Sequence, residues 1–356
     1  MPYKLTNDIV LLRMMLAEME HQSALYQPGP YWQNKTKNST NEIYRCGLEN
    51  FRSSSSQIGL SFADNLFFDI RDTWNNGFKK IAKNATNAFP LKKLFDPQVM
   101  WTKSYAEKTI SLSRQIVRLT PRVKHLLSKY HMPYTLLGSP DMTANINEED
   151  ISIHYINLLD QHDHCTEHIR FDAARSVFEI GGGFGVNIHL LLENYKNIKK
   201  VLYLDIPPNL YVGTQYLKAF YGDAVYDYSM LKDCQEIKFS ENDSREIFCI
   251  APWQIEKFTS SIDIFMNSHS FVEMPKEIVK NYVNHFQKLP AAEDSAVVLI
   301  SYDNFDVKTT LPPSDLPGFF DNRIFVYKKG GSILDSEHNN IFNISAAGFA
   351  VPQSNN

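Results

Sequence analysis

The order of hydrophobic and polar residues from position 176 to 205 predicts a strand, a glycine-rich turn, a helix and a second strand. Val177, Phe178 and Ile180 form a short apolar run typical of a buried strand. Four glycines follow, and apolar residues then recur at helical spacing at Ile188, Leu191, Leu192 and Tyr195. Residues 201–204 are apolar again, and Asp205 ends the second strand. A unit of this length joins parallel strands, so we expect the glycine turn and Asp205 at the same edge of one sheet.

The same pattern predicts more strands downstream and a mainly helical first half. Strand-like segments lie at residues 247–250, 262–266, 296–302, 323–327 and 340–344. Before residue 165 the apolar spacing is helical, as at Ile9, Leu12, Leu16 and Met19. Residues 148–150 are acidic, and we expect them in the first turn of a helix, where the helix dipole favours negative charge. The chain therefore divides into a mainly helical domain, residues 1–165, and an α/β domain, residues 170–356.

The glycine turn has the chemistry of a nucleoside-binding site. The expected ligand contacts are Gly181, Gly182, Gly183 and Gly185, which permit close backbone approach. Asp205 is placed to accept the hydroxyl groups of a ribose. A dinucleotide fingerprint fails because Val186 stands where its third glycine belongs. Glu179, two residues before the first glycine, repels a pyrophosphate but suits an ammonium and a sulfonium charge. The pattern favours S-adenosylmethionine; a nicotinamide cofactor, or a turn without a ligand, are the alternatives.

Residues that follow other predicted strands are candidates for the same site. Ile206 and Trp253 are expected beside the cofactor, with Trp253 either stacking on its adenine or simply packing. Asn267 is also a candidate for cofactor contact. His269 is the first candidate for a general base, because a neutral imidazole accepts a proton near neutral pH. Glu273 either orients His269 or acts as the base itself, and a purely structural His269 is the alternative.

The segment 177–209, with FEIGGGFG and then LYLDIPPNL, resembles the class I methyltransferases, and more narrowly the bacterial sugar O-methyltransferase family. Tyr31-Trp32 and residues 47–52 resemble the same family, and Phe51-Arg52 either contacts a ligand or anchors a loop. The resemblance implies a Rossmann-like, mostly parallel sheet of seven strands with a C-terminal antiparallel hairpin. It also implies an N-terminal domain that shapes the acceptor site, with a lid near Gly138 and Ser139, and methyl transfer from S-adenosylmethionine to a hydroxyl of a sugar or glycan. A non-sugar small-molecule acceptor, an NAD(P)-dependent oxidoreductase and a non-catalytic binding module are the alternatives.

Composition and charge limit the kinds of partner and the compartment that we expect for the chain. Its 356 residues are 43% hydrophobic and carry a net charge of −4, which gives no electrostatic case for binding nucleic acid. Four cysteines without C-x-x-C spacing indicate neither a disulfide framework nor a zinc site, and favour a reducing cytoplasm. No apolar run approaches the length of a membrane span, and charged residues interrupt the N-terminus where a signal peptide would be apolar. The oligomeric state is open, with a homo-oligomer as one alternative.

Two clusters of polar side chains allow a metal site, but neither indicates one over its alternative. His162, His164 and His168 include an i, i+4 pair that either holds a transition metal or ends a solvated helix. Asp303-Asn304 follows a predicted strand and suits either a polar substrate or a divalent metal. The site prediction contains no metal ligand.

Overall fold

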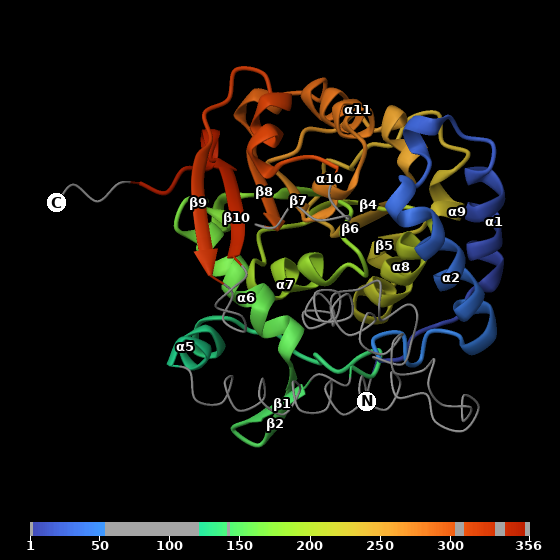
Figure 1. Cartoon of the computed structure of the whole chain (residues 1–356), viewed down its shortest axis with the longest axis horizontal. Coiled ribbons are helices and arrows are strands. Elements are labelled where there is room, and N and C mark those ends of the chain that lie inside the picture. The colour runs from blue at the N-terminus through green and yellow to red at the C-terminus, as the bar shows by residue number, and fades with distance from the viewer. Residues whose placement is uncertain (1–2, 54–120, 141–142, 303–309, 332–338, 353–356) are drawn as a thin grey trace, which may run out of the picture.

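The computed structural model describes residues 3–53, 121–140, 143–302, 310–331 and 339–352, and its centre is an eight-stranded sheet (Figure 1). The strand order is β5-β6-β4-β3-β7-β8-β10-β9. These strands are β3 (Ser176–Ile180), β4 (Lys200–Leu204), β5 (Val225–Tyr226), β6 (Glu246–Ile250), β7 (Ile264–Ser268), β8 (Ala296–Tyr302), β9 (Val326–Gly331) and β10 (Asn339–Ser345).

Pairing in the sheet is parallel from β5 to β8, and β10 is antiparallel to both β8 and β9. The Rossmann-like sheet with a C-terminal antiparallel hairpin is therefore confirmed. It has eight strands rather than seven, because the polar stretch after α8 contributes β5. Only two residues long, with Val225 buried and Tyr226 half-buried, β5 is too short to produce an alternating pattern.

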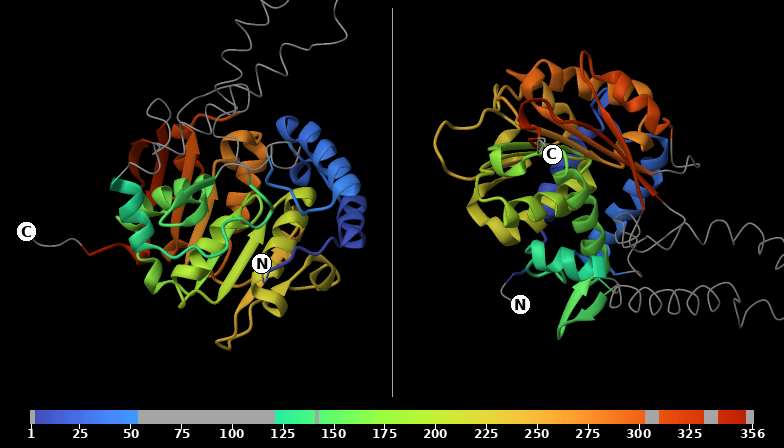
Figure 2. Two further views of the ribbon diagram at one scale, coloured as in Figure 1. Left: turned by 90° about the horizontal axis from the view of Figure 1, so that it is seen from below. Right: turned by 90° about the vertical axis from the view of Figure 1, so that its left-hand side faces the viewer.

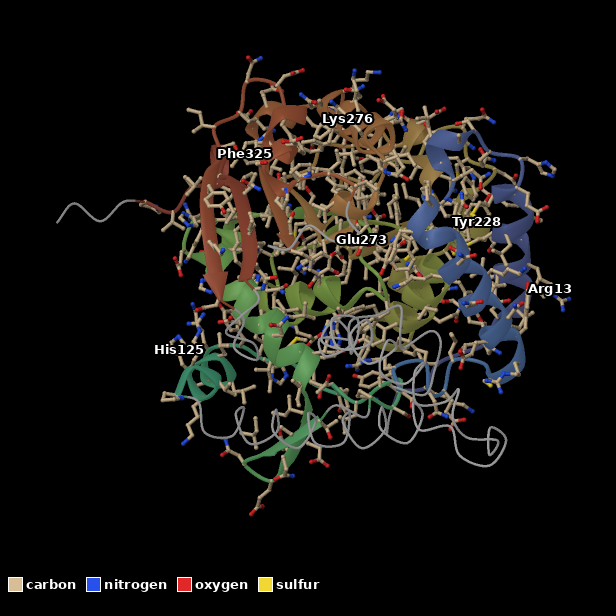
Figure 3. The ribbon with its side chains drawn as sticks, in the orientation of Figure 1. Arg13, His125, Tyr228, Glu273, Lys276 and Phe325 are labelled. Carbon is tan, nitrogen blue, oxygen red and sulfur yellow. The ribbon has the colours of Figure 1, made fainter. Side chains whose placement is uncertain are left out.

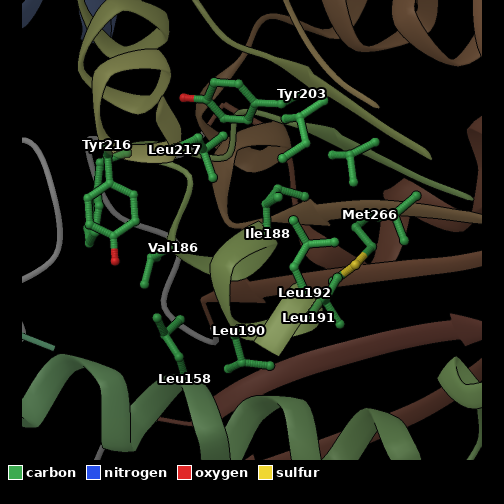
Figure 4. Packing of buried hydrophobic residues seen from close by; sticks show 14 of the residues in the cluster. Leu158, Val186, Ile188, Leu190, Leu191, Leu192, Tyr203, Tyr216, Leu217 and Met266 are labelled. Atoms are coloured by element: carbon green, nitrogen blue, oxygen red, sulfur yellow. The ribbon is translucent and has the colours of Figure 1, made fainter. Parts of the chain in front are cut away.

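Side chains alternate between the two faces of the sheet and build two cores. Val177 and Phe178 of β3 belong to different apolar clusters. The first cluster is covered by α6 (Ile153–Thr166), α7 (Val186–Asn194) and α8 (Pro207–Tyr221). Figure 4 shows its packing, with Leu190 of α7 facing Leu158 of α6 and with Leu192 beside Met266 of β7. The second cluster is covered by α10 (Ser270–Glu273) and α11 (Lys276–Gln287).

The N-terminal helices lie against the sheet domain at its β5 edge. The helices α1 (Ile9–Met19) and α2 (Pro30–Cys46) pack on α8, and α1 also contacts α9 (Tyr228–Leu231) (Figures 1 and 2). Asp8 caps α1 by accepting a hydrogen bond from the Leu11 amide at 3.0 Å. Leu12 and Met15 are fully buried in the cluster that also contains residues of α7 and α8. The helix α5 (Pro121–Lys129) packs on α6.

A small hairpin stands where we expected the start of a helix. The strands β1 (Thr143–Ile146) and β2 (Glu149–Ser152) pair antiparallel, and α6 begins only at Ile153. The two residues between them, Asn147 and Glu148, have φ angles of 52° and 68°. The acidic residues 148–150 thus belong to a tight turn and a strand, and the prediction that they form the first turn of the helix was wrong. The cause is a two-residue turn with left-handed backbone, which Asn favours.

The strand β9 forms the far edge of the sheet, opposite α1 and α2 (Figure 1). Its Val326 and Tyr327 are 47% and 58% exposed. Lys328 donates a hydrogen bond to Glu167. Among the described helices, none is both long and apolar enough to cross a membrane.

Candidate functional site

The glycine turn lies at the carboxyl edge of the sheet, where β3, β4 and β7 end in register. Ile180 pairs with Leu204 on one side and with Asn267 on the other. The φ angles of Gly181, Gly183 and Gly185 are 70°, 62° and 83°, which side chains rarely tolerate. A Cβ atom on Gly181 would lie 2.0 Å from the Ser270 hydroxyl oxygen. The turn therefore needs bare backbone, and α7 begins directly after it.

Asp205 joins the end of β4 to this turn. Its Oδ2 accepts a hydrogen bond from the Gly183 amide at 2.8 Å, and its Oδ1 accepts one from the Ile206 amide at 2.7 Å. Asn209 also donates to Oδ1, at 3.3 Å. Burial raises the pKa of Asp205 to about 7, although the backbone hydrogen bonds oppose this shift. A carboxylate has more acceptor positions than these contacts use, so Asp205 can still receive a hydroxyl group.

Glu179 presents an unsatisfied oxygen beside the same turn. The side chain is fully buried, and its Oε1 accepts a hydrogen bond from Asn187 at 2.7 Å. Its Oε2 has no hydrogen-bond partner among the described residues. A Cβ atom on Gly182 would lie only 2.5 Å from Oε2, so the oxygen faces the turn. Burial raises the pKa of Glu179 to about 7. A ligand ammonium group would supply both the missing partner and the compensating charge, so these residues fit S-adenosylmethionine.

Two further candidates are already engaged by the protein. The Asn267 amide donates to Ile180 O at 2.8 Å and to the Ser270 hydroxyl at 2.6 Å, and its oxygen accepts from the Phe271 amide at 3.0 Å. These contacts tie β7 to β3 and α10. Trp253, in the 3-10 helix Pro252–Lys257 after β6, donates to the Tyr228 hydroxyl at 3.2 Å. The side chain is half-buried, and its ring also packs edge-on against the Tyr228 ring, with 5.8 Å between the ring centroids.

His269 lies at the tip of β7 with a φ angle of 69°. Its Nδ1 is 3.0 Å from the Ser268 hydroxyl and its Nε2 is 3.1 Å from Asn340 Oδ1. The Tyr302 ring lies against the imidazole, with 4.4 Å between ring centroids. Burial lowers the pKa of His269 to about 4, so the ring is neutral at physiological pH.

Glu273 is held by a residue from the N-terminal helices. Its Oε2 accepts a hydrogen bond from the Trp32 indole at 2.8 Å, and its Oε1 accepts one from the Tyr302 hydroxyl at 3.5 Å. Figure 3 shows Glu273 in the interior of the view, beside α2. The two ring nitrogens of His269 contact Ser268 and Asn340, so these two residues, and not Glu273, orient the ring. Tyr302 links the two candidate bases instead.

Three residues of this arrangement have no role in the sequence-based prediction: Trp32, Tyr302 and Asn340. In the sequence, Tyr31-Trp32 only resembles a pair of the same family. The hydrogen bond from Trp32 spans 241 positions of the chain, and that from His269 to Asn340 spans 71. No local pattern predicts contacts at such separations.

Phe51 and Arg52 anchor a loop next to the site. Arg52 is fully buried, and its guanidinium donates to Thr135 O at 2.6 Å, to Leu137 O at 3.1 Å and to the Ser152 hydroxyl at 2.7 Å. Its backbone amide donates to Gly138 O at 2.9 Å. Of the two roles considered for this pair, loop anchoring is the one that these contacts describe.

Two histidines of the cluster before β3 contact neighbouring side chains. His162 is buried and its Nε2 is 2.8 Å from the Tyr195 hydroxyl, while His164 lies 3.4 Å from Glu167 Oε1. Within the described ranges, no group of three or more His, Cys, Asp or Glu side chains could hold a metal ion. Asp303-Asn304 lies outside the described residues.

Comparisons with known proteins give weak matches. No family model matches the chain, and no curated protein matches it. Among solved structures, the mitomycin 7-O-methyltransferase MmcR is 13% identical over 55% of this chain and 57% of that chain, with a TM-score of 0.33. An O-methyltransferase family protein from Burkholderia thailandensis is 11% identical over 54% and 57%, with a TM-score of 0.36. Spermidine synthase from Thermotoga maritima is 16% identical over 49% and 54%, with a TM-score of 0.32. The matched part is little more than half of each solved chain, and similarity at this level carries no argument about activity.

Proposed function

We propose that this chain is an S-adenosylmethionine-dependent O-methyltransferase that acts on a hydroxyl group of a sugar or glycan. The observation that carries the proposal is the unpartnered, buried Oε2 of Glu179 beside a bare glycine turn, with Asp205 fixed on the neighbouring strand. A pyrophosphate would be repelled by Glu179, whereas an ammonium group would be bound by it. The sugar acceptor rests on the family resemblance of the sequence, and a non-sugar small molecule is the alternative.

The residues present divide the work of binding and proton transfer. S-adenosylmethionine, when bound, supplies an electrophilic methyl group. Asp205 would receive the ribose hydroxyls, Glu179 would receive the amino group, and the half-buried Trp253 is proposed to pack against the adenine. The transfer requires that the acceptor hydroxyl loses its proton as the new bond forms.

His269 is proposed to take that proton. Asn340 presents its oxygen to Nε2, so Nε2 carries the hydrogen and Nδ1 keeps its lone pair. Nδ1 faces the Ser268 hydroxyl, so a proton reaches it directly or through Ser268. Because burial keeps the pKa of His269 at about 4, the ring is in its basic, neutral form before the reaction. Glu273 is the alternative base, and Trp32 then holds it in place.

Calorimetric titration with S-adenosylmethionine, S-adenosylhomocysteine and NAD tests the cofactor. We expect both sulfur-containing ligands to bind, and Asp205→Ala to weaken both by at least about tenfold, the effect of losing hydrogen bonds to a charged group. Asp223→Ala, at an exposed position, is the matched control and should bind normally. Binding of NAD without either adenosyl ligand would overturn the proposal in favour of an oxidoreductase.

A second experiment separates an enzyme from a binding module. The chain is incubated with radiolabelled S-adenosylmethionine and with cell-envelope saccharides, nucleotide sugars and non-sugar hydroxyl compounds. Label transferred by the wild type but not by His269→Ala supports catalysis and His269 as its base. Label on no acceptor, with the cofactor bound at saturation, would contradict the catalytic role.

A further inference from the structure

A buried histidine next to the glycine turn has an unsatisfied nitrogen. His154 lies in the first turn of α6, and 7% of its surface is exposed. Its Nδ1 has no hydrogen-bond partner within the described part of the chain. The ring is 6.0 Å, between centroids, from the ring of Phe184, the residue that separates Gly183 from Gly185. An unsatisfied buried nitrogen is destabilising, so its presence beside a ligand site points to a partner that arrives with the ligand.

The Arg52 guanidinium places a positive charge near this nitrogen. Burial lowers the pKa of His154 to about 3, and the charge of Arg52 lowers it further. The Arg52 guanidinium lies 5.1 Å from the Phe184 ring centroid and also holds Ser152, directly before α6, by a hydrogen bond of 2.7 Å. His154 lies in the first turn of α6, where the positive end of the helix dipole also favours negative charge. An anionic group is therefore favoured at His154.

The described residues near the turn thus include two unsatisfied buried atoms of opposite chemistry. Glu179 Oε2 suits a cation, and His154 Nδ1 suits an anion when it carries the ring hydrogen. We propose that these two atoms together bind the amino-acid end of the methyl donor: His154 donates to the α-carboxylate and Glu179 accepts from the α-ammonium group. This assignment rests on the proposed function and extends it to residues upstream of β3.

Three ligands that differ only at this end test the assignment. S-adenosylhomocysteine carries both charged groups, S-adenosyl-3-thiopropylamine lacks the carboxylate, and 5′-methylthioadenosine lacks both. In calorimetric titrations, His154→Phe should weaken S-adenosylhomocysteine about tenfold and leave the other two within about twofold. Glu179→Gln should weaken both ligands that carry the amine and spare 5′-methylthioadenosine.

Two further variants distinguish the loss of a ligand contact from a folding defect. His154→Asn keeps an N–H donor near the Nδ1 position and should restore most of the affinity for S-adenosylhomocysteine. His162→Phe, at a buried histidine further along the same helix, should change no ligand affinity. Equal weakening of all three ligands by His154→Phe, with no rescue by His154→Asn, would overturn the assignment while the proposed function stands. A wild-type chain that binds none of the three ligands would overturn both.

Discussion

At the scale of single residues, Glu179 and Asp205 differ in how completely the protein satisfies them. Asp205 accepts two backbone amides, whereas Glu179 has one oxygen without a partner among the described residues. Both carboxyl groups are buried, and burial raises the pKa of each to about 7. Without a ligand, the ionised form of each group is unfavourable in the folded state.

This unfavourable ionisation predicts a pH-dependent stability. The folded-state pKa lies above the ordinary value of 4.5 for Glu179 and 3.8 for Asp205. Their contribution to stability is therefore fully present below about pH 4 and is lost as the pH rises through about 7. Glu179→Gln should reduce this loss by on the order of 1–3 kcal/mol, measured as the free energy of urea unfolding at pH 5 and pH 8 without ligand. Glu241→Gln, at an exposed position, should change neither value, and an equal pH dependence in Glu179→Gln and the wild type would contradict the prediction.

At the scale of elements, the unit from β3 to β4 was predictable because its signals are local. The apolar run, the glycines and the following helical spacing lie within one short stretch, and Asp205 falls at a strand end by counting. The hairpin β1–β2 was not predictable in the same way, because its turn uses Glu148 in a left-handed conformation that Gly or Asn usually occupies. The contact between Trp32 and Glu273 depends on how α2 docks, which no local pattern encodes.

The glycine turn should not tolerate a side chain at its second position. A Cβ atom on Gly182 would lie 2.5 Å from Glu179 Oε2 and 2.8 Å from the Tyr203 ring. Gly182→Ala should lower the free energy of unfolding by about 1–3 kcal/mol, as overpacking does, and should weaken S-adenosylhomocysteine. Thermal unfolding and calorimetry measure the two effects. Gly318→Ala is the control, because a Cβ atom there meets nothing within 4 Å, and a stable Gly182→Ala with normal affinity would be inconsistent with the turn described.

The helix α2 should stabilise Glu273, the alternative candidate base, without contributing to binding of the methyl donor. Trp32→Phe removes the hydrogen bond to Glu273 and leaves a buried carboxylate with one donor fewer. The free energy of unfolding should fall by about 1–3 kcal/mol, while the affinity for S-adenosylhomocysteine stays within about twofold. Chemical unfolding and calorimetry separate the two. Tyr44→Phe, on an exposed part of the same helix, should leave the free energy of unfolding and the affinity for S-adenosylhomocysteine unchanged. A large loss of that affinity in Trp32→Phe would show that α2 belongs to the site of the methyl donor.

At the scale of the whole molecule, the N-terminal helices share a hydrophobic core with the sheet domain. Leu12 and Met15 of α1 are fully buried in the cluster that contains Leu190 and Leu217. This apolar cluster contains residues from both sides of the domain boundary at residues 165–170, which stays a prediction. Among the described residues, α1 and the sheet domain are expected to unfold together.

Leu12→Ala tests this cooperativity. It should lower the free energy of unfolding by about 2–5 kcal/mol, the range for a large buried residue, and should shift a single transition. Urea unfolding followed by both far-ultraviolet circular dichroism and tryptophan fluorescence gives the measurement. Val10→Ala, at a side chain that is 70% exposed, should have little effect. Two transitions, of which only one moves, would show that the helices form an independent domain.

The strand β9, at the outer edge of the sheet, has a consequence for how copies of this molecule meet. An open edge offers unpaired amides and carbonyls to the strand of another molecule. On this edge Lys328 and Lys329 follow the exposed Val326 and Tyr327, and Lys328 is already paired with Glu167, so an incoming strand would meet charged side chains. The opposite edge is less able to pair with another strand, because β5 is only two residues long and α8 packs beside it. Charge at one margin and a very short strand at the other therefore disfavour pairing between the sheets of two copies.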